Sequence, residues 1–118
     1  MVYRPLLWSF LALTLASTVA CGGNGPGDPT GSTCPSSSAL TYADFGQAFM
    51  QNNCLGCHTN NQAPSLATLD EIRVNADAID RAAAAGPNGV NTYMPQDGSV
   101  SDSERRQLGE WLACGAPE

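Results

Sequence analysis

The chain of 118 residues contains no lysine, and its five arginines face eleven aspartates and glutamates, which gives a formal net charge of −6. A nucleic-acid-binding surface needs clustered basic side chains, so this composition excludes DNA and RNA as partners. Only one histidine is present, and no Ser/His/Asp, paired-carboxylate or phosphate-loop pattern offers hydrolytic or phosphate chemistry. The main apolar stretch, residues 6–20, is shorter than the roughly 20 residues that a comfortable bilayer span takes.

One short motif contrasts with these absences, the run Cys54-Leu55-Gly56-Cys57-His58. The pattern C-x-x-C-H is typical of the attachment site of a c-type haem, in which two thiols bond to the haem vinyl groups and the histidine is held against the iron. Positions i, i+3 and i+4 of a helical turn share one face, so Cys54, Cys57 and His58 would meet one planar ring together. The sequence therefore predicts one covalently bound haem c.

Two other chemistries use a C-x-x-C pattern, and the context favours neither. A redox-active disulfide motif lies near a strand–helix–strand unit, and no β-rich run precedes Cys54. A zinc site needs a second pair of ligands at comparable spacing, whereas the remaining cysteines, Cys21, Cys34 and Cys114, are isolated. Haem attachment is the interpretation that fits the surrounding sequence.

The first twenty residues predict an export signal and not a part of the fold. Arg4 supplies a short positive region, residues 6–20 are almost wholly apolar, and small residues directly precede Cys21. We therefore expect the mature protein outside the cytoplasm, in the periplasm or at the cell surface.

The tetrapeptide Thr18-Val19-Ala20-Cys21 resembles a bacterial lipobox, in which the cysteine receives lipid and becomes the mature N-terminus. Ordinary cleavage after Ala20 is the alternative. The count of five cysteines favours lipidation, because two take the haem and a lipid on Cys21 leaves one pair for a disulfide. That pair is Cys34 and Cys114, for which two free thiols are the alternative.

Residues 21–33 predict a lipid-anchored, flexible linker. Positions 22–33 hold five glycines, two prolines and no hydrophobic side chain, so they cannot bury enough surface to order themselves. Such a chain has a typical end-to-end distance of about 20 Å. Gly22 occupies a position where aspartate would suggest inner-membrane retention in some bacteria, which favours the outer membrane. Residues 34–118 remain as one small domain, for which a covalent haem supplies a large apolar plate to pack around.

Apolar residues at helical spacing predict three to four helices and no strand. The first helix is expected over residues 41–53, with Thr41 as its cap. One or two more helices are expected within residues 64–86, starting with a capping box at Thr68. The spacing leaves open whether a break falls near Asn75.

The last predicted helix has the clearest boundaries. A capping box at Ser101 starts it, and Cys114-Gly115 ends it. The apolar residues from Leu108 to Leu112 give it a buried face, which places Arg105 and Arg106 on the solvent side. We therefore expect the domain to be all-α.

The second axial ligand of the iron is expected to be Met94. The chain has no second histidine and no lysine, and after removal of the signal only Met50 and Met94 remain as methionines. Met50 lies one turn before Cys54, on the same segment as His58, and is badly placed to reach the far face of the ring. Met94 lies in a loop, where Pro95 biases it towards an extended backbone. A buried core methionine is the alternative for Met94.

The order of helix, C-x-x-C-H, further helices, Met-Pro loop and C-terminal helix over residues 41–114 resembles a small class I cytochrome c of bacteria. The residues that carry the resemblance are Gly46, Phe49, the run 54–58, Ala63-Pro64-Ser65-Leu66, Tyr93-Met94-Pro95 and Leu108 to Leu112. The resemblance implies a cytochrome c fold in which the N- and C-terminal helices cross, with Gly46 close to Trp111. It also implies that the Pro64 carbonyl accepts a hydrogen bond from the His58 ring N–H, which would fix the tautomer and tune the iron.

Ligation by both His58 and Met94 would leave the iron no open position, which suits one-electron transfer and not substrate binding. The sequence thus predicts a membrane-tethered electron carrier, not an enzyme by itself, that serves redox partner proteins and is anchored through a lipid on Cys21. A five-coordinate haem protein acting as a peroxidase or small-gas sensor is the alternative if Met94 does not bind. A haem subunit held permanently by a dehydrogenase or oxidase is a further alternative.

Overall fold

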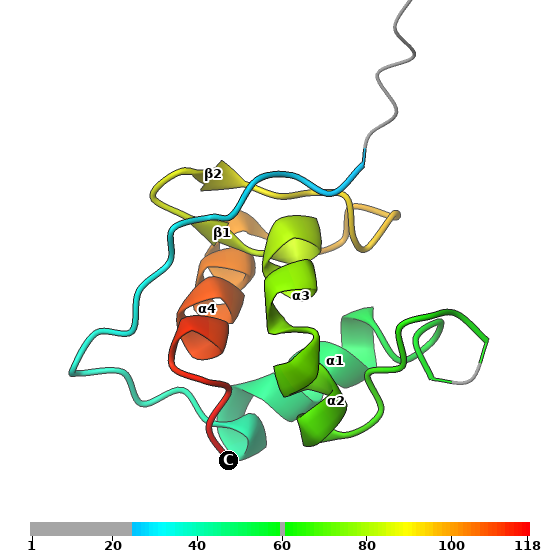
Figure 1. The fold of residues 1–118 in the computed structure, drawn as a ribbon, viewed down its shortest axis with the longest axis horizontal. Helices are drawn as coiled ribbons and strands as arrows, with labels where there is room; N and C mark the ends of the chain where they lie inside the picture. The colour runs from blue at the N-terminus through cyan, green and yellow to red at the C-terminus, as the bar shows by residue number, and fades with distance from the viewer. Residues whose placement is uncertain (1–24, 60) are drawn as a thin grey trace, which may run out of the picture.

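The computed structural model describes residues 25–59 and 61–118, so the predicted signal peptide and Cys21 lie outside the described residues. The fold is mostly helical (Figure 1). In chain order its elements are a π-helical turn η1 (Tyr42–Gly46), helices α1 (Gln47–Asn53), α2 (Leu69–Val74) and α3 (Ala76–Ala83), strands β1 (Ala85–Gly86) and β2 (Gly89–Val90), and helix α4 (Asp102–Ala113). Within the described ranges no helix is long and apolar enough to cross a membrane.

The helix expected over residues 41–53 is present, but its first turn is wider than an α-helical turn. Thr41 Oγ1 accepts a hydrogen bond from the Asp44 N–H at 3.0 Å and so caps the start. The Gly46 N–H donates to the Thr41 carbonyl five residues back, which makes η1 a π-helical turn before α1 continues. The two elements therefore form one helical segment that leads into the C-x-x-C-H motif.

Residues 64–86 hold two helices, and the break between them falls at Asn75. Thr68 and Glu71 form the expected capping box at the start of α2, and the hydrogen bond from the Thr68 N–H holds the pKa of Glu71 below its ordinary value. The backbone N–H and the side-chain amide of Asn75 both donate to the Glu71 carbonyl, at 3.1 and 2.8 Å. The Asn75 carbonyl then accepts from the Ile79 N–H and begins α3.

A two-stranded antiparallel hairpin follows α3, and the expectation of an all-α domain misses it. Ala85 pairs with Val90, and Gly86 pairs with Gly89. Strands of two residues are too short to show the alternating pattern that marks a strand in a sequence. Strand β1 lies against α4, where a Cβ atom on Gly109 would come within 2.6 Å of the Ala85 carbonyl oxygen. Glycine thus allows the hairpin to approach the helix backbone.

Helix α4 has the boundaries that the sequence predicts. Ser101 forms the capping box at its start. At its end the Gly115 N–H donates to the Leu112 carbonyl at 2.9 Å, and the Ala116 N–H donates to the Trp111 carbonyl at 3.0 Å. Gly115 has a φ of +84°, so these two bonds form a Schellman motif, in which glycine adopts the left-handed conformation at little cost.

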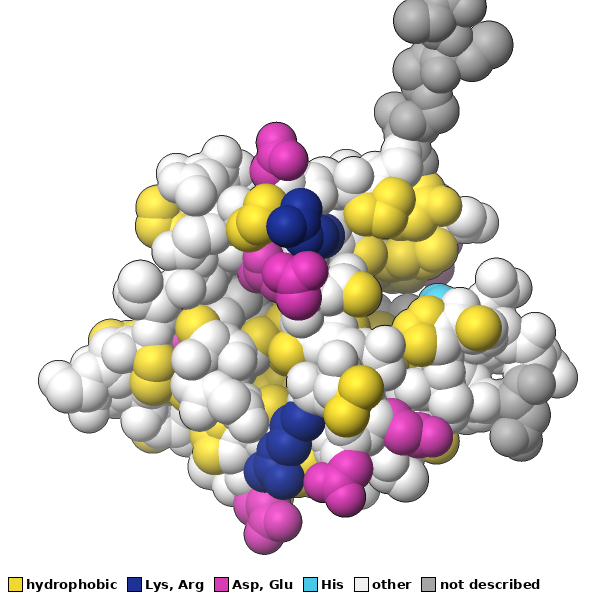
Figure 2. All heavy atoms as spheres, in the orientation of Figure 1, with side chains coloured by type: hydrophobic (Ala, Val, Ile, Leu, Met, Phe, Trp, Pro, Cys, Tyr) yellow, Lys and Arg dark blue, Asp and Glu magenta, His cyan; other side chains and the backbone are white. Residues whose placement is uncertain are grey.

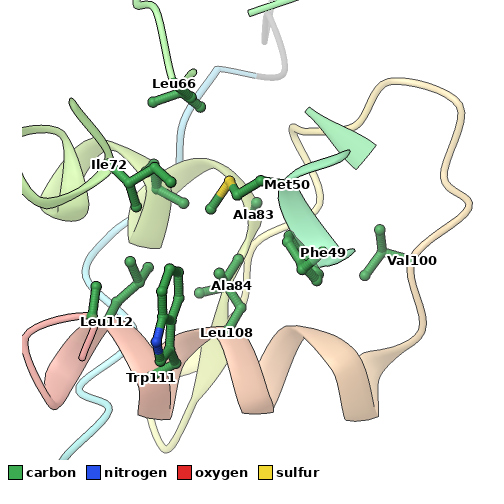
Figure 3. Packing of buried hydrophobic residues seen from close by; sticks show 12 residues of the cluster. Phe49, Met50, Leu66, Ile72, Ala83, Ala84, Val100, Leu108, Trp111 and Leu112 are labelled. Atoms are coloured by element: carbon green, nitrogen blue, oxygen red, sulfur yellow. The ribbon is translucent and has the colours of Figure 1, made fainter. Parts of the chain in front are cut away.

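Trp111 lies in the middle of the hydrophobic core, between α4 and the other helices (Figure 3). Gly46 packs directly against its indole ring, where a Cβ atom would overlap the ring, as the resemblance implies. The Tyr42 and Phe45 ring centroids lie 6.3 and 6.1 Å from that of Trp111. Trp111 therefore holds the N-terminal helical segment to the C-terminal helix. The core contains Phe49, Met50, Leu66, Ile72, Ile79, Ala83, Ala84, Val100, Leu108, Trp111, Leu112 and Ala116.

Residues 27–33, which we call the N-terminal strap, pack on the domain, whereas their composition predicts a flexible linker. Thr30 is only 1% exposed. Its N–H and its hydroxyl both donate to the Asp80 carboxylate, at 2.8 and 2.6 Å. The Ser32 hydroxyl donates to the Ala85 carbonyl at 3.1 Å. Polar hydrogen bonds, and not apolar burial, hold the strap in place. The expectation of a flexible linker, which rests on low hydrophobicity, is therefore wrong for residues 27–33.

Cys34 and Cys114 form the expected disulfide, which joins residues 80 positions apart. It ties the segment that follows the strap to the C-terminal end of α4. A cross-link that closes so long a loop contributes up to about 4–5 kcal/mol in the chain-entropy model. The bond therefore constrains almost the whole domain.

Replacing Thr30 with valine keeps the shape of the side chain but removes the hydroxyl that donates to Asp80. We expect the free energy of unfolding of the haem-loaded protein to fall by about 1–3 kcal/mol, because the half-buried Asp80 carboxylate loses one of its donors. Denaturant-induced unfolding measures the change. The matched control is Thr33→Val at an exposed position, which should stay within about 0.5 kcal/mol of wild type. Equal effects of the two substitutions would contradict a packed strap.

Candidate haem site

The C-x-x-C-H motif forms a single turn directly after α1. The N–H groups of Cys57 and His58 both donate to the Cys54 carbonyl, at 3.2 and 2.8 Å. These bonds have the i+3 and i+4 spacing of helical turns. The two thiols and the imidazole therefore extend from one turn of backbone.

The two motif cysteines differ in exposure. Cys54 is half-buried and packs against the core, whereas Cys57 is exposed. Neither takes part in a disulfide. Burial raises the pKa of the Cys54 thiol to about 11. Both sulfurs are thus free to bond to a prosthetic group, and Cys54 is a neutral thiol at neutral pH.

The loop that follows the motif orients the His58 ring. Its Nδ1 lies 3.0 Å from the Pro64 carbonyl oxygen. A carbonyl can only accept a hydrogen bond, so Nδ1 carries the hydrogen and Nε2 keeps its lone pair for a metal. The Leu66 N–H donates to the His58 carbonyl at 2.8 Å and closes the loop that places Pro64 at the ring. The contact that the resemblance implies between His58 and Pro64 is therefore present.

Met94 lies half-buried in the loop of residues 91–99 and packs against the core. Its N–H donates to the Ala82 carbonyl at 2.8 Å, and its own carbonyl accepts a hydrogen bond from Arg105 Nη1 at 2.7 Å. Met50, in contrast, is 0% exposed and lies inside the core (Figure 3). Of these two methionines, only Met94 is accessible from outside the core.

The expectation that Arg105 faces solvent is wrong, because its side chain is buried. Arg105 is 1% exposed, whereas Arg106 is exposed. Arg105 precedes Leu108 by three residues and Leu112 by seven, which is the spacing of one helix face. The helical period therefore predicts that Arg105 faces inward. The expectation that it faces solvent rests on its charge, because a charged side chain is usually exposed.

Three backbone carbonyls accept hydrogen bonds from one nitrogen of the buried Arg105 guanidinium. Its Nη1 lies 2.8 Å from the Ala83 oxygen, 2.9 Å from the Asn91 oxygen and 2.7 Å from the Met94 oxygen. Burial lowers the pKa of Arg105, and the carboxylates in the first turn of α4 oppose this effect. An arginine side chain does not lose its proton in proteins, so the group stays charged at neutral pH.

The C-x-x-C-H turn and the loop of residues 91–99 lie on the same side of the molecule (Figure 1). Figure 2 shows a hollow between these two parts, with the histidine (cyan) at its edge and hydrophobic side chains (yellow) on both sides. Apolar walls, two free thiols and an imidazole nitrogen with an available lone pair are the groups that a covalently attached haem requires. The residues present therefore fit haem c.

Residues 42–112, from η1 into α4, match the family model of cytochrome C oxidase, cbb3-type, subunit III. The chain belongs to this family. It is therefore a small c-type cytochrome, and its family performs electron transfer with a covalently bound haem c. Domains of this type are generally exported. No curated protein and no solved structure matches the chain.

Replacing Met50 with alanine should destabilise this cytochrome without changing the ligands of its iron. We expect the free energy of unfolding to fall by about 2–5 kcal/mol, because the substitution leaves a cavity in the core. Denaturant-induced unfolding gives the stability, and the visible absorption spectrum of the folded variant gives the ligation. A stable variant with an altered axial ligand would contradict the assignment of Met50 to the core.

Proposed function

We propose that this cytochrome carries single electrons between partner proteins on the outer side of a bacterial membrane, with one haem whose iron is held by His58 and Met94. The observation that carries the proposal is the difference between the two methionines. Met50 is buried in the core, whereas Met94 lies half-buried in the loop that borders the hollow. The chain has no second histidine and no lysine that could compete as a ligand.

Each residue of the site would have one task. Cys54 and Cys57 would form thioether bonds, and His58 and Met94 would bind the iron from its two sides. The Pro64 carbonyl holds the His58 ring in the tautomer that leaves Nε2 free. The bound haem c supplies reversible one-electron transfer. With both axial positions filled by side chains of this chain, the site would exclude substrates and small gases.

The N- and C-terminal helices would cross next to the haem, as the resemblance implies. The support for this crossing is the direct packing of Gly46 on the Trp111 ring, with Tyr42 and Phe45 beside it. Such a crossing would hold the segment that ends in the motif against the helix that carries Arg105.

A lipid on Cys21 would tether the domain to the membrane. The chain has five cysteines, of which two form the observed disulfide and two belong to the motif. Cys21 is then the one cysteine left over, at the end of an apolar segment that predicts an export signal. Gly22 after it supports the outer membrane as the location.

The redox partners are expected to present a basic surface. Among the described arginines, Arg81 pairs with Asp77 at 3.0 Å and Arg105 is buried. Arg73 donates to the Ala116 carbonyl at 3.1 and 3.0 Å. These three cations are bonded within the fold, whereas Arg106 is exposed, so the eleven acids outnumber the cations available at the surface. A negative surface attracts a basic partner and accelerates its association.

The family description favours one second candidate, a haem subunit that stays bound to an oxidase. The chemistry at this chain would be the same, and only the permanence of the partnership would differ. In a native gel of a mild-detergent membrane extract, haem c of a free carrier would migrate near the mass of this chain. A permanent subunit would migrate with a much larger haem-containing complex.

Replacing Met94 with alanine should open one axial position of the iron. We expect the ferrous wild-type protein to refuse carbon monoxide at neutral pH. The variant should bind it at least about tenfold more tightly, a difference of about 1.4 kcal/mol. Its reduction potential should fall, because His/Met ligation raises the potential. Optical titration with carbon monoxide and potentiometry measure the two effects.

The matched control for Met94 is Gln96→Ala, at an exposed position of the same loop. This variant should refuse carbon monoxide as the wild type does. Tight binding of carbon monoxide by the wild-type protein would instead favour the five-coordinate peroxidase or gas-sensor function.

Replacing Cys21 with serine should abolish lipid attachment. We expect cells that receive a labelled fatty acid to incorporate the label into the wild-type cytochrome and not into the variant. Intact-mass measurement of the purified proteins checks the result, with Asn24→Ser as a control that leaves the cysteine in place. A wild-type protein with the unmodified mass of a chain that begins at Cys21 would contradict the tether.

A further inference from the structure

Arg105 is a buried cation beside the loop that carries Met94, and the electron-transfer chemistry proposed above does not account for it. Its exposed fraction is 1%, and no ion pair reaches it among residues 25–59 and 61–118. Moving a charged group out of water is strongly unfavourable unless neighbouring groups compensate its charge. The groups around Arg105 must therefore provide that compensation.

Three backbone carbonyls compensate the charge, those of Ala83, Asn91 and Met94, at 2.7 to 2.9 Å from Nη1. They belong to the end of α3, the start of the loop of residues 91–99, and Met94 itself. The guanidinium comes from the first half of α4, which lies beside α3 (Figure 1). Hydrogen bonds from a charged donor are roughly twice as strong as neutral ones. One side chain thus joins three segments of the chain.

Both backbone groups of Met94, its N–H and its carbonyl, are hydrogen-bonded. Its N–H donates to the Ala82 carbonyl at 2.8 Å, and its carbonyl accepts from Arg105 at 2.7 Å. With both backbone groups bonded, the point from which its side chain extends is fixed relative to α3 and α4. Removing the Arg105 donor would break the hydrogen bond to the Met94 carbonyl and leave only the bond from the Met94 N–H.

We propose that Arg105 is a positioning residue that clamps the Met94 loop and so keeps Met94 on the iron. The inference rests on the proposed function, in which Met94 is the axial ligand. Arg105 acts through the Met94 carbonyl and needs no contact with the haem. Without this clamp, three carbonyls lose a common donor, and the loop spends more time in conformations that leave the axial position open.

The experiment compares three variants of the haem-loaded full chain. Arg105→Leu removes both the donor and the charge, and Arg105→Lys keeps the charge but loses the forked guanidinium. Arg106→Leu is the matched control, because it removes an exposed arginine from the next position of the same helix. The measurements are the dissociation constant of carbon monoxide from the ferrous protein and the NMR signal of the iron-bound methionine methyl group.

We expect Arg105→Leu to lower the carbon monoxide dissociation constant by at least about tenfold, because the apparent affinity scales with the fraction of molecules whose site is open. Its bound-methionine signal should weaken. Arg105→Lys should show a smaller change in the same direction. Arg106→Leu should stay within about twofold of wild type.

Folded Arg105 variants with the carbon monoxide affinity and methionine signal of wild type would overturn the clamp and leave Met94 ligation intact. An equal effect of Arg106→Leu would also overturn it, because loss of charge alone would then explain the result. If Arg105→Leu does not fold, Arg105→Lys decides between the outcomes. Wild-type protein that binds carbon monoxide as tightly as Met94→Ala would overturn the ligation itself, and the clamp with it.

Discussion

Two buried side chains of α4, Trp111 and Arg105, hold the two halves of the site, and the rest of the structure depends on them. Trp111 packs against Gly46 and fixes the helical segment that leads into C-x-x-C-H. Arg105, six residues earlier, binds the loop that carries Met94. In the proposed site His58 and Met94 bind one iron although they are distant in sequence, so they would need a common support. Helix α4 would be that support, and a shift of it would move both His58 and Met94.

Much of the fold can be predicted from the sequence, because the signals involved are local. The caps at Thr68 and Ser101 depend on side chains that bond to a backbone group three residues away. The end of α4 depends on one glycine, Gly115, that accepts a positive φ. The C-x-x-C-H turn is equally local, since its hydrogen bonds span three and four residues. Such features need no knowledge of what packs against them.

The features that sequence reasoning misses are polar contacts between distant segments. Thr30 is held by Asp80, 50 residues away, so the composition of the strap says nothing of its partner. Arg105 is held by carbonyls, and every residue carries one, so no particular side chain marks them in the sequence. Its burial could have been read from the helical period, as its spacing to Leu108 shows. Charge alone is a poor guide to exposure when backbone carbonyls can accept the hydrogen bonds that water would otherwise accept.

In the proposed lipid-anchored protein, the packed strap would also shorten the distance that the domain can move from the membrane. The Gly27 N–H bonds to the Arg81 carbonyl at 2.7 Å, and the Asn91 side chain bonds to the Asp28 carbonyl at 2.9 Å, so the strap begins beside the loop of residues 91–99. A free linker from a lipid on Cys21 to Cys34 would reach about 45 Å, whereas the chain up to Gly27 reaches only about 20 Å. The loop that bears Met94 would then stay close to the lipid headgroups. A partner anchored in the same bilayer would meet this cytochrome by diffusing within the membrane plane, so that their search for each other would be two-dimensional.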